Sequence, residues 1–444
     1  MPPSKSDIKL TREQFLLVTG GSALTFALAA LGFRERTTIK RQEPWPTDPE
    51  NILKRIKELN FPVGSELRTT IFPRKIMWEA VQVLKAKDEW SYDIDESDWL
   101  RRLDIFEEHI ARLAANGIKG GRLEVVPFEL TQDGINFNYA PLEKAIEIMA
   151  QHGMKVDLCL GPIDYPYYPG FRLPINLENQ LEETFSTGGI NQIFISEQPD
   201  PLYPEVSQNI SDFATRFLQE TLSRYGHDPR IDKLYLGNEW PDEHGIEGVE
   251  GTMNVSQELM LQFAQMIMDG SDKKVAINTN IHPTQPDEFT LKLGPLLNLL
   301  GDRGVLGLDV YPTREAKVHT EKEAIPDYAA LINELRRRFP DTELVFTEFQ
   351  AEPWPPEGIA GQSWIDIFRQ HPEIFINFFQ RSFPPSLESH IIASGITEVG
   401  LWGAPAWLTG EKSEYDFPLE MMQTIAETME DGKATSADPL HRFR

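Results

Sequence analysis

Two glutamates, Glu239 and Glu348, each follow a short apolar segment that has the composition of a buried strand. The segments have the sequences LYLGNEWP (residues 234–241) and LVFTEF (residues 344–349). If both strands end at the same rim of a parallel barrel, the two carboxyl groups face each other. A pair about 5 Å apart suits double displacement at a glycosidic carbon, with one nucleophile and one acid/base. The sequence therefore predicts a catalytic pair of carboxyl groups.

The surroundings of the two glutamates suggest different roles for them. Glu239 lies beside Trp240 with no evident cation nearby, and apolar walls favour the proton-donating form of a carboxyl group. We therefore expect Glu239 to be the acid/base and Asn238 to bind a sugar hydroxyl. Glu348 is the expected nucleophile. Glu352 is a rival nucleophile, but it lies beyond the strand end; a solvated position on the rim is the alternative for Glu239.

The rest of the chain alternates apolar strand-like segments with segments of helical periodicity, as in parallel α/β proteins. Such a series predicts a closed (β/α)8 barrel, and the absence of a Gly-rich phosphate loop disfavours a doubly wound sheet. A first strand is expected somewhere within 61–85. The other seven are expected at Ile118–Val126, Met154–Gly161, Ile231–Leu236, Lys274–Asn280, Val305–Val310, Glu343–Phe349 and Glu398–Trp402.

Two long loops are expected after the third and seventh strands, at 162–204 and 350–385. Both would lie at the carboxyl-terminal face, where barrel enzymes keep their active sites. The second loop contains Trp354, whose ring could stack on a sugar. The alternative is that aromatic residues in these loops form small hydrophobic cores of their own.

These motifs resemble the retaining glycosidases of clan GH-A, cellulase-like TIM-barrel enzymes with Asn-Glu after the fourth strand and a nucleophilic glutamate after the seventh. The chain looks closest to a poorly characterised bacterial group with a Glu-x-Gln-Ala-Glu-Pro-Trp motif. The matching residues, which fall within about residues 60–410, are Asn238-Glu239-Trp240-Pro241, Glu348 to Trp354, and Leu401-Trp402-Gly403. The resemblance implies a retaining glycoside hydrolase. No cofactor is expected, and no metal either, because the nine histidines form no His-x-His or His-Glu-x-x-His motif.

The resemblance also implies roles for residues at other strand ends. Arg122 would orient the nucleophile and favour its ionised form, Tyr311 would donate a hydrogen bond to it, and Trp402 would form the floor of the sugar site. His282 or Asn280 would contact substrate. The alternatives are an Arg122–Glu124 pair, a rim position for Tyr311 and a structural role for His282.

The chain departs from the group at two places that bear on the sugar site. An acidic residue often follows the Trp-Gly of the eighth strand, but here Ala404 and Pro405 follow Trp402-Gly403. The histidine expected after the third strand is replaced by the segment 161–165, GPIDY. The choice of sugar is therefore not carried over.

The amino-terminal segment is expected to direct the protein out of the cytoplasm. Residues 15–33 contain 19 residues without a charge, with cationic residues on both sides, which suits an export signal or a membrane anchor. The alternative is a buried helix. The predicted division of the chain is 1–36 signal or anchor, 37–56 linker, 57–425 barrel and 426–444 polar tail.

The composition limits the kinds of partner. The formal net charge of −26 disfavours nucleic acids and anionic membrane surfaces. The single cysteine, Cys159, lies in an expected strand and excludes an intrachain disulfide. The predicted partner is a carbohydrate substrate. A non-catalytic sugar-binding envelope protein and a transglycosylase with the same two glutamates remain alternatives, and the sequence does not indicate an oligomeric state.

Overall fold

The structure is a computed structural model in which Trp45–Arg444 form one compact unit. Within that unit we describe the following residues: 45–73, 102–124, 130–131, 133–160, 173–188, 192–238, 244–246, 249–279, 290–311, 328–351, 374, 378–404 and 412–436. The structural statements below concern these residues.

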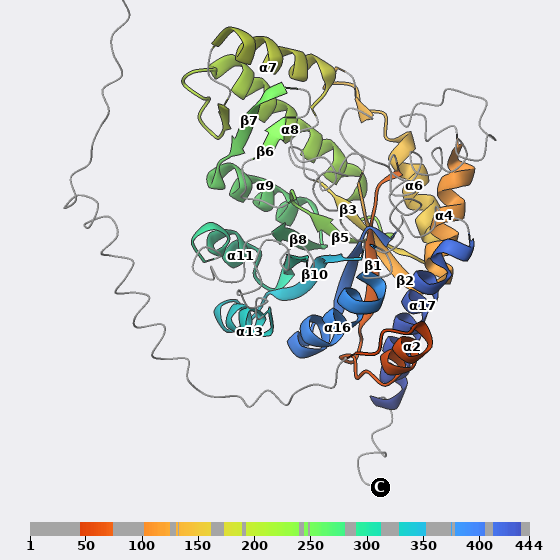
Figure 1. The fold of residues 1–444 in the computed structure, drawn as a ribbon. Coiled ribbons are helices and arrows are strands. Elements are labelled where there is room, and N and C mark those ends of the chain that lie inside the picture. The colour runs from red at the N-terminus through yellow and green to blue at the C-terminus, as the bar shows by residue number, and fades with distance from the viewer. Residues whose placement is uncertain are drawn as a thin grey trace, which may run out of the picture. The chain divides into compact units, whose positions relative to one another are not determined.

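Eight parallel strands close into a barrel in the order β1-β11-β10-β9-β8-β5-β3-β2 (Figure 1). This arrangement confirms the predicted (β/α)8 barrel. The strand that the sequence did not place is β1, and it lies inside the expected window of 61–85. The bounds are β1 (Glu66–Ile71), β2 (Ile118–Leu123), β3 (Lys155–Cys159), β5 (Ile231–Tyr235), β8 (Lys274–Thr279), β9 (Gly304–Val310), β10 (Glu343–Gln350) and β11 (Glu398–Trp402).

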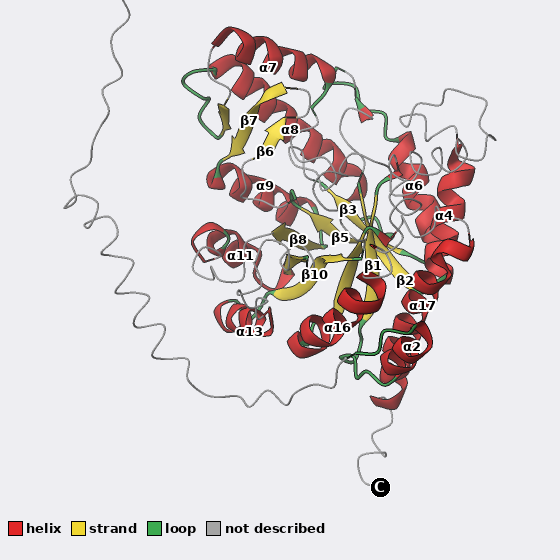
Figure 2. Cartoon of the chain, in the orientation of Figure 1, coloured by secondary structure: helices red, strands yellow, loops and turns green. Residues whose placement is uncertain are grey.

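Helices pack on the outer face of the barrel, where α4 contacts β2, α6 contacts β3 and α9 contacts β8 (Figure 2). Each buries an apolar stripe with helical spacing, as α4 does with Phe106, Ile110 and Leu113. The helices are α2 (Pro49–Lys57), α4 (Leu103–Ala115), α6 (Ala140–Gln151), α8 (Pro204–Tyr225), α9 (Gln257–Gly270), α11 (Gly294–Leu300), α13 (Tyr328–Arg338), α16 (Phe383–Ser386) and α17 (Lys412–Ser436), with the shorter helical turns η2 (Gly301–Arg303), η3 (Phe378–Ser382) and η4 (Leu387–Ile392).

A second, three-stranded sheet is built from the connections after β3 and β5. The predicted loop 162–204 contains helix α7 (Ile175–Gly188) and strand β4 (Gln192–Ile195). Strands β6 (His244–Ile246) and β7 (Val249–Val255) follow β5, and β7 pairs in parallel with β4. This sheet was not predicted from the sequence.

Two helices, α2 and α17, extend beyond the predicted bounds of the barrel, 57–425. Helix α2 lies largely within the predicted linker 37–56, because Asp48 caps its first turn and Pro49 suits the first helical position. Its Ile52 and Ile56 are fully buried, and α2 packs against α17. Helix α17 extends into the predicted polar tail 426–444, because Met429 continues the buried face of the helix.

Membrane attachment concerns the amino-terminal segment, and residues 15–33 lie outside the described part. Among the helices that are described, none is long and apolar enough to cross a membrane. Export or anchoring through residues 15–33 stays a prediction.

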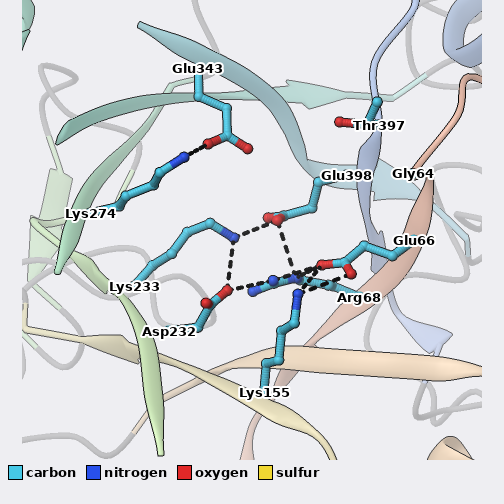
Figure 3. A pocket seen from close by; sticks show the side chains of 10 residues that line it. All are labelled: Gly64, Glu66, Arg68, Lys155, Asp232, Lys233, Lys274, Glu343, Thr397 and Glu398. Atoms are coloured by element: carbon cyan, nitrogen blue, oxygen red, sulfur yellow. Dashed lines mark hydrogen bonds and ion pairs between the residues drawn. The ribbon is translucent and has the colours of Figure 1, made fainter. Parts of the chain in front are cut away.

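The barrel interior changes character along its axis. Midway, Cys159, Tyr235, Ala276, Val305 and Val345 form an apolar layer. At the amino-terminal end the interior is charged: Arg68 binds Asp157 at 2.5 Å and Asp232 at 2.6 Å, and it also contacts Glu66 and Glu398. Lys233 binds Glu398. Figure 3 shows all of these side chains except Asp157 around a pocket of about 290 Å³, where they converge from β1, β5 and β11.

Candidate active site

The carboxyl-terminal end of the barrel holds the Glu348 carboxylate between two donors. Glu348 is 2% exposed. Nη2 of Arg122, on β2, donates to its Oε1, and the hydroxyl of Tyr311, just after β9, donates to its Oε2. Each carboxylate oxygen therefore accepts one hydrogen bond, and three strand ends converge on this one group.

The charge of Arg122 is set by its contact with Glu348. Burial disfavours the guanidinium cation, but the negative charge of Glu348, together with smaller contributions from Asp309 and other neighbours, raises the pKa of Arg122 above its ordinary value. Arg122 also lies over the ring of Tyr235, with Cζ 5.5 Å from the ring centre. The cation at this buried position therefore stays opposite the carboxylate at all physiological pH values.

A β-bulge in β10 turns Glu348 into the barrel. Val345 belongs to the interior layer, whereas the ring of Phe349 contacts Phe383 on the outer helices. Strict alternation from Val345 would send Glu348 outward, but the pairing with β9 shifts between Phe346 and Glu348. The extra residue is Thr347, whose Oγ1 donates to Asp309 Oδ1 at 2.8 Å. The bulge thus re-aims the side chain that follows it.

Two glycines leave the space that this bulge occupies. A Cβ on Gly400 would lie 2.2 Å from the carbonyl oxygen of Thr347, and a Cβ on Gly307 would lie 2.3 Å from its Cγ2. Because the first neighbour is backbone, it cannot move aside without changing the strand.

We therefore expect Gly400→Ala to lower the free energy of unfolding by about 1–3 kcal/mol, the usual cost of overpacking a core. Gly432→Ala in α17 is the matched control, because its Cβ would meet nothing closer than 3.8 Å. Alanine at that helical position should leave stability unchanged or raise it. Urea denaturation measures both variants; equal midpoints for the two would contradict the steric role assigned to Gly400.

A series of polar contacts runs around the barrel mouth from Arg122 to Thr347, the residue directly before Glu348. Arg122 Nη1 donates to Asn238 Oδ1 at 3.1 Å, and Asn278 Nδ2 donates to the same oxygen at 2.6 Å. Asn278 Nδ2 also donates to Asp309 Oδ2 at 3.1 Å. Asp309 in turn accepts a hydrogen bond from Thr347, so the series ends on the residue before Glu348. It joins β2, the end of β5, β8, β9 and β10.

An aromatic cluster of Phe72, Tyr311 and Trp402 lies at the same end of the barrel. The rings of Phe72 and Trp402 meet edge to face with centroids 5.5 Å apart. Both residues lie at the carboxyl ends of neighbouring strands, β1 and β11. The cluster gives the site an apolar wall beside the charged Arg122 and Glu348.

Five of the predicted site residues have described positions. The structure brings Arg122, Asn238, Tyr311 and Glu348 into one hydrogen-bonded group and places Trp402 in the aromatic cluster. Glu239 follows directly after Asn238 in the chain but lies outside the described residues, as do His282 and Trp354. The rivals Asn280 and Glu352 lie outside them as well.

Four residues at this end of the barrel were not predicted from the sequence. Phe72 was missed because β1 was not placed. Asn278 and Asp309 left a usable signal: each is a buried polar side chain that follows an apolar run near the carboxyl end of its strand. Thr347 left none, because a bulge depends on pairing between strands.

Comparisons with known proteins give distant similarities. No family model and no curated protein matches the chain. A β-galactosidase from the haloarchaeon Halorubrum lacusprofundi is 15% identical with a TM-score of 0.45, over 74% of this chain and 56% of that one. A β-galactosidase from Marinomonas ef1 is 12% identical with a TM-score of 0.47, over 85% and 61%. A GH5_18 protein from Streptomyces cattleya, solved with GlcNAc, is 13% identical with a TM-score of 0.48, over 84% and 81%.

The chain thus spans less than two thirds of either β-galactosidase. At these identities a function has to follow from the site residues themselves.

Proposed function

We propose that the protein is a retaining glycoside hydrolase that cleaves a β-linked glycoside or polysaccharide, with Glu348 as nucleophile and Glu239 as acid/base. One observation carries the proposal: a buried glutamate at the carboxyl-terminal end of a barrel strand accepts hydrogen bonds from Arg122 and Tyr311. The same Arg122 also donates to Asn238, the residue directly before Glu239. Arg122 therefore joins the proposed nucleophile to the residue that precedes the proposed acid/base in the chain.

In the first step, a carboxylate oxygen of Glu348 bonds to the anomeric carbon while the bond to the leaving oxygen breaks. Glu239 donates the proton that this oxygen needs. In the second step, Glu239 takes a proton from water, the water oxygen bonds to the anomeric carbon, and the ester to Glu348 breaks. Arg122 and Tyr311 orient the Glu348 carboxylate before attack, and they donate hydrogen bonds to it again when the ester breaks.

The remaining groups of the site suit a sugar. Sugars have apolar ring faces and polar edges, and the apolar wall of Phe72 and Trp402 and the amide of Asn238 lie at the same end of the barrel. Trp354 and His282 remain proposed substrate contacts.

The first experiment is a screen of aryl glycosides and of plant, algal and bacterial polysaccharides, followed by proton NMR of the first product. We expect the released sugar to appear first with the anomeric configuration of the substrate. Initial release of the opposite anomer would contradict the retaining mechanism. Binding without cleavage across the screen would instead indicate a sugar-binding barrel, and sugar-to-sugar products would indicate transglycosylation.

A further inference from the structure

The orientation of the Asn238 amide is fixed by donors on two strands. A guanidinium group only donates hydrogen bonds, so the atom of Asn238 that faces Arg122 must be its oxygen. Asn278 Nδ2 donates to the same oxygen, so both of its acceptor positions are used. The amide nitrogen is then the free end: among the described residues, none accepts a hydrogen bond from it.

Asn278 is itself fixed by an acceptor. It is 0% exposed, and its Nδ2 lies between the oxygen of Asn238 and the carboxylate of Asp309. A carboxylate accepts and does not donate, so turning the Asn278 amide over would set oxygen against oxygen on both sides. In the present orientation Asn278 Oδ1 is buried without a partner in the described part of the chain. An unsatisfied acceptor is costly, which shows that the two donated bonds dominate the orientation.

Resting on the proposed function, we propose that Asn278, held by Asp309, is a positioning residue that presents the Asn238 amide nitrogen to a sugar hydroxyl. Asn238 then offers the substrate only N–H groups, and the bound hydroxyl must accept at this point. The contact that forms is therefore set by residues on the next two strands of the barrel, β8 and β9, and not by Asn238 alone. Asn278 contributes to substrate selection without touching the substrate.

Two substitutions of Asn278 distinguish a positioning role of this residue from a role in packing alone. Asn278→Leu keeps a similar volume and removes both donated bonds. Asn278→Asp keeps the shape and places an oxygen where the nitrogen donates, so it favours the reversed Asn238 amide. Asn116→Asp is the matched control for the second change, because Asn116 ends α4, which leads into the amino-terminal end of β2.

The experiment uses the aryl glycoside that the wild-type protein cleaves best, together with its set of monodeoxy analogues. Asn238→Ala identifies the relevant hydroxyl, because this variant and the wild type should differ least on the analogue that lacks it. On the parent glycoside, Asn278→Leu and Asn278→Asp should each lower kcat/KM roughly 10- to 100-fold, mainly through kcat, as expected for a hydrogen bond that strengthens in the transition state. On that one analogue the loss should nearly vanish, and Asn116→Asp should match the wild type on all substrates.

Equal losses on the parent and on every analogue would overturn the proposal and leave Asn278 a packing residue. Failure of the proposed function has a different signature: no glycoside is cleaved, or Glu348→Ala retains the wild-type rate. In that event the side-chain amide signals of protein labelled with ¹⁵N-asparagine decide the positioning role. Asn278→Leu should shift the Asn238 amide protons, and unchanged signals would overturn the inference.

Discussion

Glu348→Ala is expected to lower kcat on an aryl glycoside by at least roughly 10⁴-fold, the scale on which loss of a covalent nucleophile slows other enzymes. Alanine removes the group that forms the glycosyl ester, while Arg122 and Tyr311 keep their places on other strands. Initial rates on the best aryl glycoside measure the loss. Glu352→Ala is the matched control, a glutamate four residues later that should keep most of the activity. The reverse result would move the nucleophile to Glu352.

Glu239→Ala is measured in the same experiment, and its loss of activity should depend on the leaving group. Loss of a general acid and base costs roughly 10²- to 10⁴-fold, and least where the leaving group needs no proton. Added azide separates the two roles by product configuration. With Glu239→Ala, azide attacks the ester to Glu348 and gives a glycosyl azide of retained configuration. With Glu348→Ala, azide attacks the substrate directly and gives the inverted product. The same configuration from both variants would contradict the assigned roles.

Arg68→Met is expected to lower the free energy of unfolding by about 3–5 kcal/mol, the cost of removing one partner from a buried ion pair. Arg68 is 3% exposed and holds Asp157, which is also buried, together with Glu66, Asp232 and Glu398. Methionine fills a similar volume but leaves these carboxylates with less compensating charge. Chemical denaturation at pH 7 measures the loss.

Lys274→Met is the matched control from the same pocket (Figure 3). Lys274 pairs with Glu343, and the two side chains are 49% and 33% exposed. Exposed pairs contribute about 0–1 kcal/mol, so this variant should be close to the wild type. Similar losses for Arg68→Met and Lys274→Met would show that burial of the charged layer does not decide its energetic importance.

The cost of Arg68→Met should shrink as the pH falls. Burial acts to raise the pKa of Glu66 and of Asp232, but Arg68, together with Lys155 and, for Asp232, Lys233, holds each pKa below its ordinary value. Carboxyl groups with lowered pKa stabilise the fold above their ordinary pKa, and the contribution is lost as the pH falls through the lowered values. The variant keeps only the part that Lys155 and Lys233 supply, so it has less stability to lose as the pH falls. Denaturation between pH 7 and about pH 3 should therefore show the two curves converging; curves of constant separation would exclude this coupling.

Most of the barrel and part of the site could be predicted from the sequence, and particular residues show the physical reasons. Strands such as β9 were placed because a continuous apolar run identifies a strand buried on both faces. Strand β1 was missed because Arg68 and two threonines interrupt its pattern, and the ion pairs that bury Arg68 come from distant strands. Arg122 and Tyr311 were selected through a resemblance, and the structure places both against Glu348.

Other features depend on pairing, which local sequence does not carry. The bulge at Thr347 exists because β10 is matched against β9 and β11, and only this match shows why Gly400 lacks a side chain. The amide orientation of Asn278 likewise depends on neighbours from two other strands.

The three-stranded sheet joins the connections after β3 and β5, so an engineered exchange of one connection would have to include the other. Strand β4 comes from the first connection and β7 from the second, and they pair along Gln192–Ile195 and Thr252–Val255. The second connection is also the one that contains Glu239. Grafting a foreign connection after β3 alone would leave β7 an open edge, a known route to aggregation. A chimera designed to change the substrate should therefore transfer residues 162–204 and 239–255 together.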